Sequence, residues 1–61
     1  MFYFYRYWFN PANIVTMKTN VTDNVIEILL TTGKTVEIVC SDYEQVQKRE
    51  KEFLAKFKEA K

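Results

Sequence analysis

The chain has 61 residues, a formal net charge of +1, one cysteine and no histidine. A chain of this length forms one domain, here spanning residues 1–61, and buries only about 60% of the surface that its unfolded form exposes. Such domains usually need a disulfide, a metal or a partner subunit. A single cysteine without histidine excludes an intrachain disulfide and a cysteine–histidine zinc site. We therefore expect self-association, as a homodimer or a higher oligomer.

The first predicted element is a strand over residues 2–9, in which every side chain except that of Arg6 is aromatic. Aromatic residues favour strands. If the strand is continuous, its alternation gives two faces. One carries Phe2, Phe4, Arg6 and Trp8, and the other carries Tyr3, Tyr5, Tyr7 and Phe9. Both faces are candidates for burial, which is more than a strand in so small a domain requires.

Three further strands are predicted over residues 14–19, 25–31 and 34–40. Alternating apolar positions, Ile26-x-Ile28 and Val36-x-Ile38, give the last two strands one apolar face each. Gly33 supplies the positive φ that a tight hairpin loop between them needs. Together with the first strand, they predict a four-stranded antiparallel β-meander.

A helix is predicted over residues 42–59, which makes the fold class α+β. Ser41-x-x-Glu44 has the spacing of a capping box, and an apolar stripe follows at helical spacing. The stripe consists of Tyr43, Val46, Phe53, Leu54 and Phe57. Glu50 lies inside it. Either its carboxylate is paired, with Arg6 as the candidate partner, or the helix leaves the sheet there and its distal aromatic residues project beyond the domain.

From residue 10 to residue 46 the pattern resembles the small FlbD (SwrD-type) flagellar-associated proteins, and also many short bacterial and phage proteins. The matching residues are Asn10-Pro11, Ile14, Ile26-x-Ile28-x-Leu30, Gly33-Lys34, Val36, Ile38 and Ser41-Asp42-Tyr43-Glu44-x-Val46. The resemblance implies a meander-plus-helix fold and no catalytic residue. The aromatic start and the longer helix depart from that family.

Few residues offer catalytic chemistry. The usual general base, histidine, is absent, and Cys40 consequently has no histidine to activate it. Cys40 follows a strand and precedes a helix, where a thiolate can be stabilised, but a core position beside Val36 and Ile38 is the simpler interpretation. Glu27 and Glu37 can form a carboxylate pair, but two glutamates on a solvated sheet face are far commoner than a catalytic pair. We expect a non-enzymatic protein without a cofactor or a metal.

The sequence also predicts a cytoplasmic protein that does not bind a membrane. No stretch reaches the roughly 18 apolar residues of a membrane helix. The aromatic start lacks the basic leader and the small-residue cleavage site of a signal peptide. The unpaired thiol of Cys40 suits a reducing compartment.

Three interpretations of the aromatic segment stay open: a protein interface, a stacking platform for bases beside Arg6, and ordinary core. The candidate binding residues are Tyr3, Tyr5, Arg6, Tyr7, Trp8, Phe9, Phe53 and Phe57. The leading hypothesis is a homo-oligomeric protein-interaction module, such as a phage-encoded inhibitor of a host protein or a small bacterial regulator. The alternative is a protein that sequesters a nucleotide signal or binds single-stranded nucleic acid. A structural component of a larger assembly is a third possibility.

Overall fold

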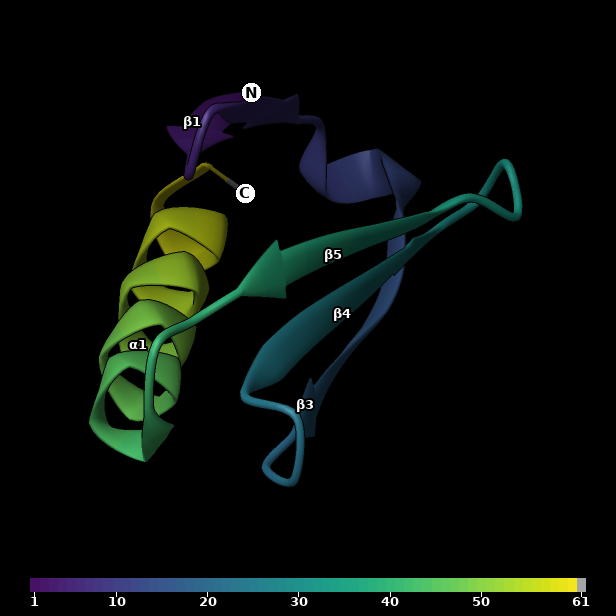
Figure 1. Cartoon of the computed structure of the whole chain (residues 1–61). Helices are drawn as coiled ribbons and strands as arrows, with labels where there is room; N and C mark the ends of the chain where they lie inside the picture. Colours follow the sequence, from purple (N-terminus) through teal and green to yellow (C-terminus); the bar gives the residue numbers. More distant parts are fainter. Residues whose placement is uncertain (61) are drawn as a thin grey trace.

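The computed structural model describes residues 1–60 and shows two small antiparallel sheets packed against one helix (Figure 1). The α+β class is confirmed, but a two-stranded and a three-stranded sheet replace the single four-stranded meander. The elements in chain order are β1 (Phe2–Phe4), β2 (Tyr7–Phe9), the 3-10 turn η1 (Pro11–Asn13), β3 (Ile14–Asn20), β4 (Val25–Leu30), β5 (Thr35–Val39) and α1 (Tyr43–Ala60).

The predicted continuous strand over residues 2–9 is wrong, because the chain reverses inside it. Tyr5 and Arg6 have φ angles of 48° and 75° and form a two-residue turn between β1 and β2. Positive φ at both central positions gives a turn the twist that joins two antiparallel strands. Phe2 consequently pairs with Phe9, and the aromatic segment forms a hairpin.

The hairpin register gathers the three phenylalanines on one face, which Tyr7 shares because it pairs with Phe4. Phe2, Phe4 and Phe9 are only 7%, 2% and 3% exposed and lie in the core. Tyr3 and Trp8, which pair with each other on the opposite face, are exposed. The predicted faces are therefore wrong for Tyr7, Trp8 and Phe9, which all change sides because the turn shifts the alternation.

The three-stranded sheet has the order β3-β4-β5, as the local pattern indicated. Ile26, Ile28 and Ile38 on its inner face are fully buried. The predicted positive φ of Gly33 is confirmed at 88°. The observed strands differ from the predicted ranges by one residue at most ends, and a bulge interrupts the pairing of β3 with β4 near Ile14.

The helix α1 begins and ends one residue later than predicted, and Asp42 rather than Ser41 provides its N-terminal cap. The main-chain N–H of Gln45 donates to Asp42 Oδ1 at 2.9 Å. The capping residues are therefore Asp42 and Gln45 and not the predicted Ser41 and Glu44. The helix starts later because the connection between β5 and α1 is longer than predicted.

The distal half of α1 stays packed on the domain. Phe53 is 1% exposed and meets Phe2, Phe4 and Phe9 edge-on, with ring centroids 5.5, 5.3 and 5.7 Å away. The expectation that the helix projects beyond Glu50 is therefore wrong. The proposed pairing of Glu50 with Arg6 is also not observed within residues 1–60, where the recorded ion pair joins Arg49 and Glu52. Glu50 is half-buried.

Candidate protein-binding surface

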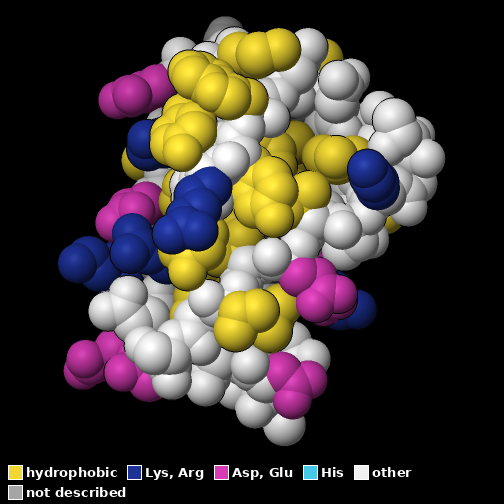
Figure 2. All heavy atoms as spheres, turned by 45° about the horizontal axis from the view of Figure 1, so that its top comes forward, with side chains coloured by type: hydrophobic (Ala, Val, Ile, Leu, Met, Phe, Trp, Pro, Cys, Tyr) yellow, Lys and Arg dark blue, Asp and Glu magenta, His cyan; other side chains and the backbone are white. Residues whose placement is uncertain are grey.

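Four aromatic side chains of the hairpin are exposed, and we call them the aromatic surface. Tyr3, Tyr5, Tyr7 and Trp8 are 45%, 41%, 45% and 68% exposed. The rings of Tyr3 and Trp8 pack together with centroids 5.1 Å apart. Figure 2, in which the hairpin end of the molecule comes forward, shows hydrophobic side chains gathered on this side with Lys and Arg beside them. Aromatic residues exposed together in this way are typical of binding surfaces.

Side chains from distant parts of the molecule hold the hairpin in place. The Tyr5 hydroxyl donates to the Val39 carbonyl at 3.2 Å, which ties the turn to the end of β5. The guanidinium carbon of Arg49 lies 5.5 Å from the centroid of the Tyr5 ring, a cation–π distance. Lys56 Nζ donates to the Tyr3 carbonyl at 2.9 Å. Contacts with β5 and α1 thus support a turn whose φ angles are unfavourable for Tyr and Arg.

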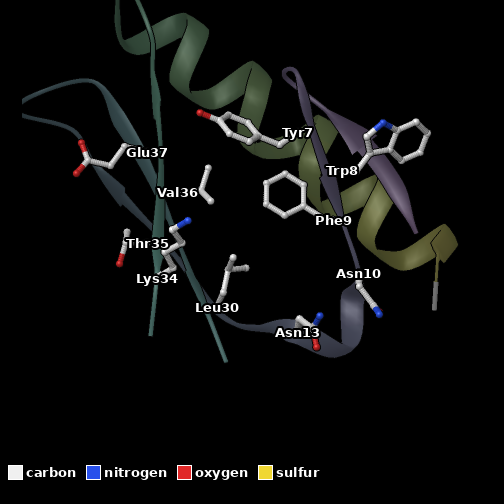
Figure 3. Close-up of a pocket in the computed structure, with 10 residues that line it drawn as sticks. All are labelled: Tyr7, Trp8, Phe9, Asn10, Asn13, Leu30, Lys34, Thr35, Val36 and Glu37. Atoms are coloured by element: carbon white, nitrogen blue, oxygen red, sulfur yellow. The ribbon is translucent and has the colours of Figure 1, made fainter. Parts of the chain in front are cut away.

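A groove of about 460 Å³ lies between β2 and β5, the neighbouring edges of the two sheets. Its lining residues are Tyr7, Trp8, Phe9, Asn10, Asn13, Leu30, Lys34, Thr35, Val36 and Glu37. Figure 3 shows the side chains of Phe9, Leu30 and Val36 directed into the space, whereas those of Trp8 and Glu37 point away from it. The groove therefore has an apolar floor, and an indole and a carboxylate lie on either side of its mouth.

The structure divides the predicted binding residues into two groups. Tyr3, Tyr5, Tyr7, Trp8 and Arg6 are exposed at or beside the hairpin turn. The other three support the fold: Phe9 and Phe53 are buried, and Phe57 is half-buried with its ring centroid 6.3 Å from that of Phe53. The core interpretation is thus confirmed for the buried phenylalanines, and the interface interpretation stays a prediction for the exposed side chains.

The sequence reasoning missed the contribution of β5 to the groove. Lys34, Thr35 and Val36 were expected only as parts of a meander strand. Because β5 is the last strand of the predicted sheet, its outer edge was a recognisable signal. The other half of the groove was not recognisable, because β2 had not been separated from β1.

The side chain of Cys40 is half-buried at the junction of β5 and α1. Burial raises the pKa of the Cys40 thiol, the positive charge of Arg49 opposes that rise, and the negative charge of Asp42 adds to it. A raised pKa disfavours the reactive thiolate. The structure thus favours the interpretation of Cys40 as a packing residue over that of a nucleophile.

Glu27 and Glu37 are directly opposite each other on β4 and β5, as the sequence suggested. Lys18 pairs with Glu27 from the other side on β3. Residues 1–60 contain no group of three or more His, Cys, Asp and Glu side chains placed to hold a metal ion. Lys18 thus stands beside Glu27 in the row of charged residues across the sheet, and Glu37, on the edge strand, lines the groove together with Lys34.

Comparisons with known proteins identify no relative. No family model matches the sequence, and neither the curated proteins nor the solved structures give a significant match. The resemblance to the FlbD (SwrD-type) proteins stays a prediction. Within residues 1–60, no helix has both the length and the apolar character that a membrane span requires.

Proposed function

We propose that this chain is a non-enzymatic, homo-oligomeric protein-interaction module that binds through its aromatic surface. A phage-encoded inhibitor of a host protein and a small bacterial regulator, each acting in the cytoplasm, are roles of this kind. The observation that carries the proposal is the exposure of Tyr3, Tyr5, Tyr7 and Trp8 on a hairpin whose other aromatic residues fill the core.

The energetic argument is that this exposure is unfavourable in an isolated small domain. Burial of apolar area contributes about 25 cal/mol per Å², and aromatic side chains present the largest areas. The hydroxyl and indole N–H groups also let Tyr and Trp form hydrogen bonds at a contact that is partly wet. A second copy packed on Tyr3 and Trp8 would remove this area from water and stabilise both chains.

Size-exclusion chromatography with light scattering tests self-association directly. We expect an oligomer at micromolar concentration and a monomer for Trp8→Ala. Leu54→Ala is a matched control, because Leu54 is also an exposed apolar residue but belongs to α1 and not to the aromatic surface. A monomeric wild-type chain, or an equal effect of both substitutions, would contradict the proposal.

A second candidate function is binding of a nucleotide or of single-stranded nucleic acid, with a base stacked on the aromatic surface. The observation that favours it is the position of Arg6, Arg49 and Lys56 around the hairpin, where Arg49 and Lys56 contact Tyr5 and the Tyr3 carbonyl. Binding of a polyanion generally needs a basic surface, and a net charge of +1 provides little of one.

Trp8 is the only tryptophan, so its fluorescence reports directly on this second function. Stacking of a base on the indole quenches it. Titration with nucleoside monophosphates and with short single-stranded oligonucleotides should give saturable quenching that Arg6→Ala weakens. Unchanged fluorescence at about 1 mM ligand would mean a free energy of binding weaker than about −4 kcal/mol. That result would argue against this function.

A further inference from the structure

We propose that the groove between β2 and β5 binds one extended strand of another protein, and that this strand carries a Lys or Arg on its solvent-facing side. The proposal deepens the proposed interaction function by naming a second surface and the chemistry of its partner. It rests on that function only in assuming that the chain binds protein, because it does not require self-association.

The first argument is the direction of the main-chain groups of β5. At the end of the β4–β5 ladder, the N–H of Cys40 donates to the Asn24 carbonyl at 2.8 Å. Antiparallel ladders alternate hydrogen-bonded and non-hydrogen-bonded pairs. Ile38 and Val36 therefore also bond to β4, since they follow at steps of two residues.

The main-chain groups of Thr35, Glu37 and Val39 consequently point to the other side of β5, toward the groove. The Val39 carbonyl bears this out, because it accepts the hydroxyl of Tyr5. No strand of residues 1–60 pairs with this side of β5. The N–H and C=O groups of Thr35 and Glu37 are therefore free to pair with a strand.

The second argument is that β2 presents a facing edge. A two-residue turn places Phe4 and Tyr7 in a hydrogen-bonded pair, so the main-chain groups of Trp8 point away from β1. The same alternation directs the Tyr3 carbonyl to the opposite edge of the hairpin, where Lys56 does bond to it. The groove thus has main-chain donors and acceptors on both walls, from β5 and from β2. The one side-chain hydrogen bond to these groups is that of Tyr5 to the Val39 carbonyl, at one end of the groove.

The two walls decide the shape of the partner. An edge strand that belongs to a folded sheet would bring its own neighbouring strands into the space that β2 occupies. A single extended segment has only its backbone and alternating side chains to accommodate. Addition of one such strand to an exposed edge is a common mode of peptide recognition. On this arrangement, alternate side chains of the segment contact Phe9, Leu30 and Val36 on the floor.

Charge decides the chemistry of the partner. A second copy of the chain that paired along the whole of β5 would place two Glu37 carboxylates opposite each other, because Glu37 is the central residue of the strand. Like charges directly opposite each other destabilise a sheet, and Glu27 beside Glu37 adds to the repulsion. A Lys or Arg on the solvent-facing side of the segment would instead pair with Glu37, since opposite charges on neighbouring strands stabilise a sheet.

The test uses the full chain and a synthetic probe, the end-capped hexapeptide Thr-Lys-Val-Lys-Val-Thr. We expect binding with a Kd below about 1 mM in a two-dimensional NMR titration of the ¹⁵N-labelled chain. The amide signals of Thr35, Glu37 and Trp8 should shift and should exchange with deuterium more slowly in the complex. The same peptide with Glu in place of both Lys residues should bind at least about ten-fold more weakly.

Thr35→Pro removes one groove-facing N–H and leaves the pairing with β4 intact, as proline is tolerated on edge strands. We expect it to weaken peptide binding about five-fold. Thr19→Pro is the matched control, because Thr19 has its N–H on the open edge of β3, away from the groove. A peptide N-methylated at its central residues tests the same hydrogen bonds with the wild-type chain. Its affinity for the wild-type chain should be no higher than that of the unmethylated peptide for Thr35→Pro.

Absence of binding, or equal binding of the Lys and Glu peptides, would overturn the proposal. Chemical-shift changes confined to the side of the sheet that carries Thr19 would also overturn it. So would a chain without peptide in which the amides of Thr35 and Glu37 are protected from exchange and lose that protection on dilution. The last outcome would make a second copy the occupant. Peptide binding by a monomeric chain would refute only self-association, and an oligomer that fails to bind the peptide would refute only the groove.

Discussion

The β1–β2 hairpin and the β3–β5 sheet reach the same kind of structure by different means. In the sheet, the turn between β4 and β5 has Gly33 at its positive φ, and the buried isoleucines of β4 and β5 lie at every second position. In the hairpin, the positive φ angles fall on Tyr5 and Arg6, and both faces are aromatic. The sheet is thus specified by its own local sequence, whereas the hairpin depends on contacts with the rest of the molecule.

This difference separates the residues that form the core from those to which we assign the proposed binding. The inner face of the sheet and Val46 of α1 form a core that needs no help from the hairpin's exposed residues. The hairpin contributes Phe2, Phe4 and Phe9 to that core and keeps its Tyr and Trp side chains outside. A hairpin held by distant contacts is a suitable carrier for a binding surface, because its exposed residues can vary without loss of the core.

The largest expected effect comes from removal of the ring that the hairpin packs against. Phe53→Ala deletes the edge-on contacts with three phenylalanines and leaves a cavity, which typically costs about 3–5 kcal/mol. We expect the free energy of unfolding in urea to fall by that amount and the hairpin amides to lose protection first. Leu54→Ala, at the next position but 44% exposed, should cost less than about 1 kcal/mol. Equal loss of protection in the sheet and the hairpin would contradict the proposed division.

A matched pair of turn substitutions should change stability in opposite directions. Gly33→Ala places a Cβ at φ 88°, where no atom lies within 4 Å, so the cost of about 1–2 kcal/mol is purely one of backbone conformation. Arg6→Gly relieves the same kind of strain at φ 75° and should stabilise the chain by up to about 1 kcal/mol. Thermal unfolding followed by circular dichroism measures both. A destabilised Arg6→Gly variant would mean that the Arg6 side chain holds the turn.

A smaller effect is expected where the hairpin is joined to the sheet. Tyr5→Phe removes the hydroxyl that donates to the Val39 carbonyl and should cost about 0.5–1 kcal/mol. Amide hydrogen exchange should accelerate at the turn while Ile26 and Ile38 stay protected. Tyr3→Phe is the control, because its hydroxyl makes no hydrogen bond within residues 1–60, and its effect on stability should be close to zero. Equal exchange rates in the two variants would show that the hydroxyl of Tyr5 does not secure the turn.

The smallest effect concerns Cys40, at the end of the sheet. Because the pKa of its thiol is raised in the folded chain, its contribution to stability is complete below the unfolded value near 9.0 and is lost as pH rises through the folded pKa. Alkylation by iodoacetamide below that pH should be slower in the folded chain than in concentrated guanidinium. A folded-state rate that equals or exceeds the unfolded rate would restore the interpretation of a reactive thiol.

The sequence predicted those parts of the fold whose signals are local. Gly33, the alternation of Ile26 and Ile28, and the helical spacing of Val46 and Phe53 each act over a few residues, and the sheet and helix follow from them. The helix cap was missed by one residue because Asp42-x-x-Gln45 and Ser41-x-x-Glu44 both fit the capping pattern. The length of the connection between β5 and α1 decides which of the two residues, Ser41 or Asp42, caps the helix.

The hairpin could not be predicted in the same way. Tyr5 and Arg6 have no intrinsic preference for the turn, which is imposed by Val39, Arg49 and Lys56 from far along the chain. One local signal was present: the rings without a polar atom occupy positions 2, 4 and 9. A single strand scatters them over both faces, whereas a reversal at residues 5 and 6 gathers them on one. Neither the local signals of the sheet nor the positions of the phenylalanines predict the groove. It forms only where the edges of the two sheets lie beside each other.

The bond between Lys56 and Tyr3 spans 53 positions of sequence, and this separation sets an order of events during folding. Segments that are neighbours in the chain pair with little loss of loop entropy, so we expect β3, β4 and β5 to associate early. The phenylalanines of the hairpin stay uncovered until α1 packs on them. Chains truncated before Phe53 should therefore bind chaperones through residues 2–9, and the full chain should not.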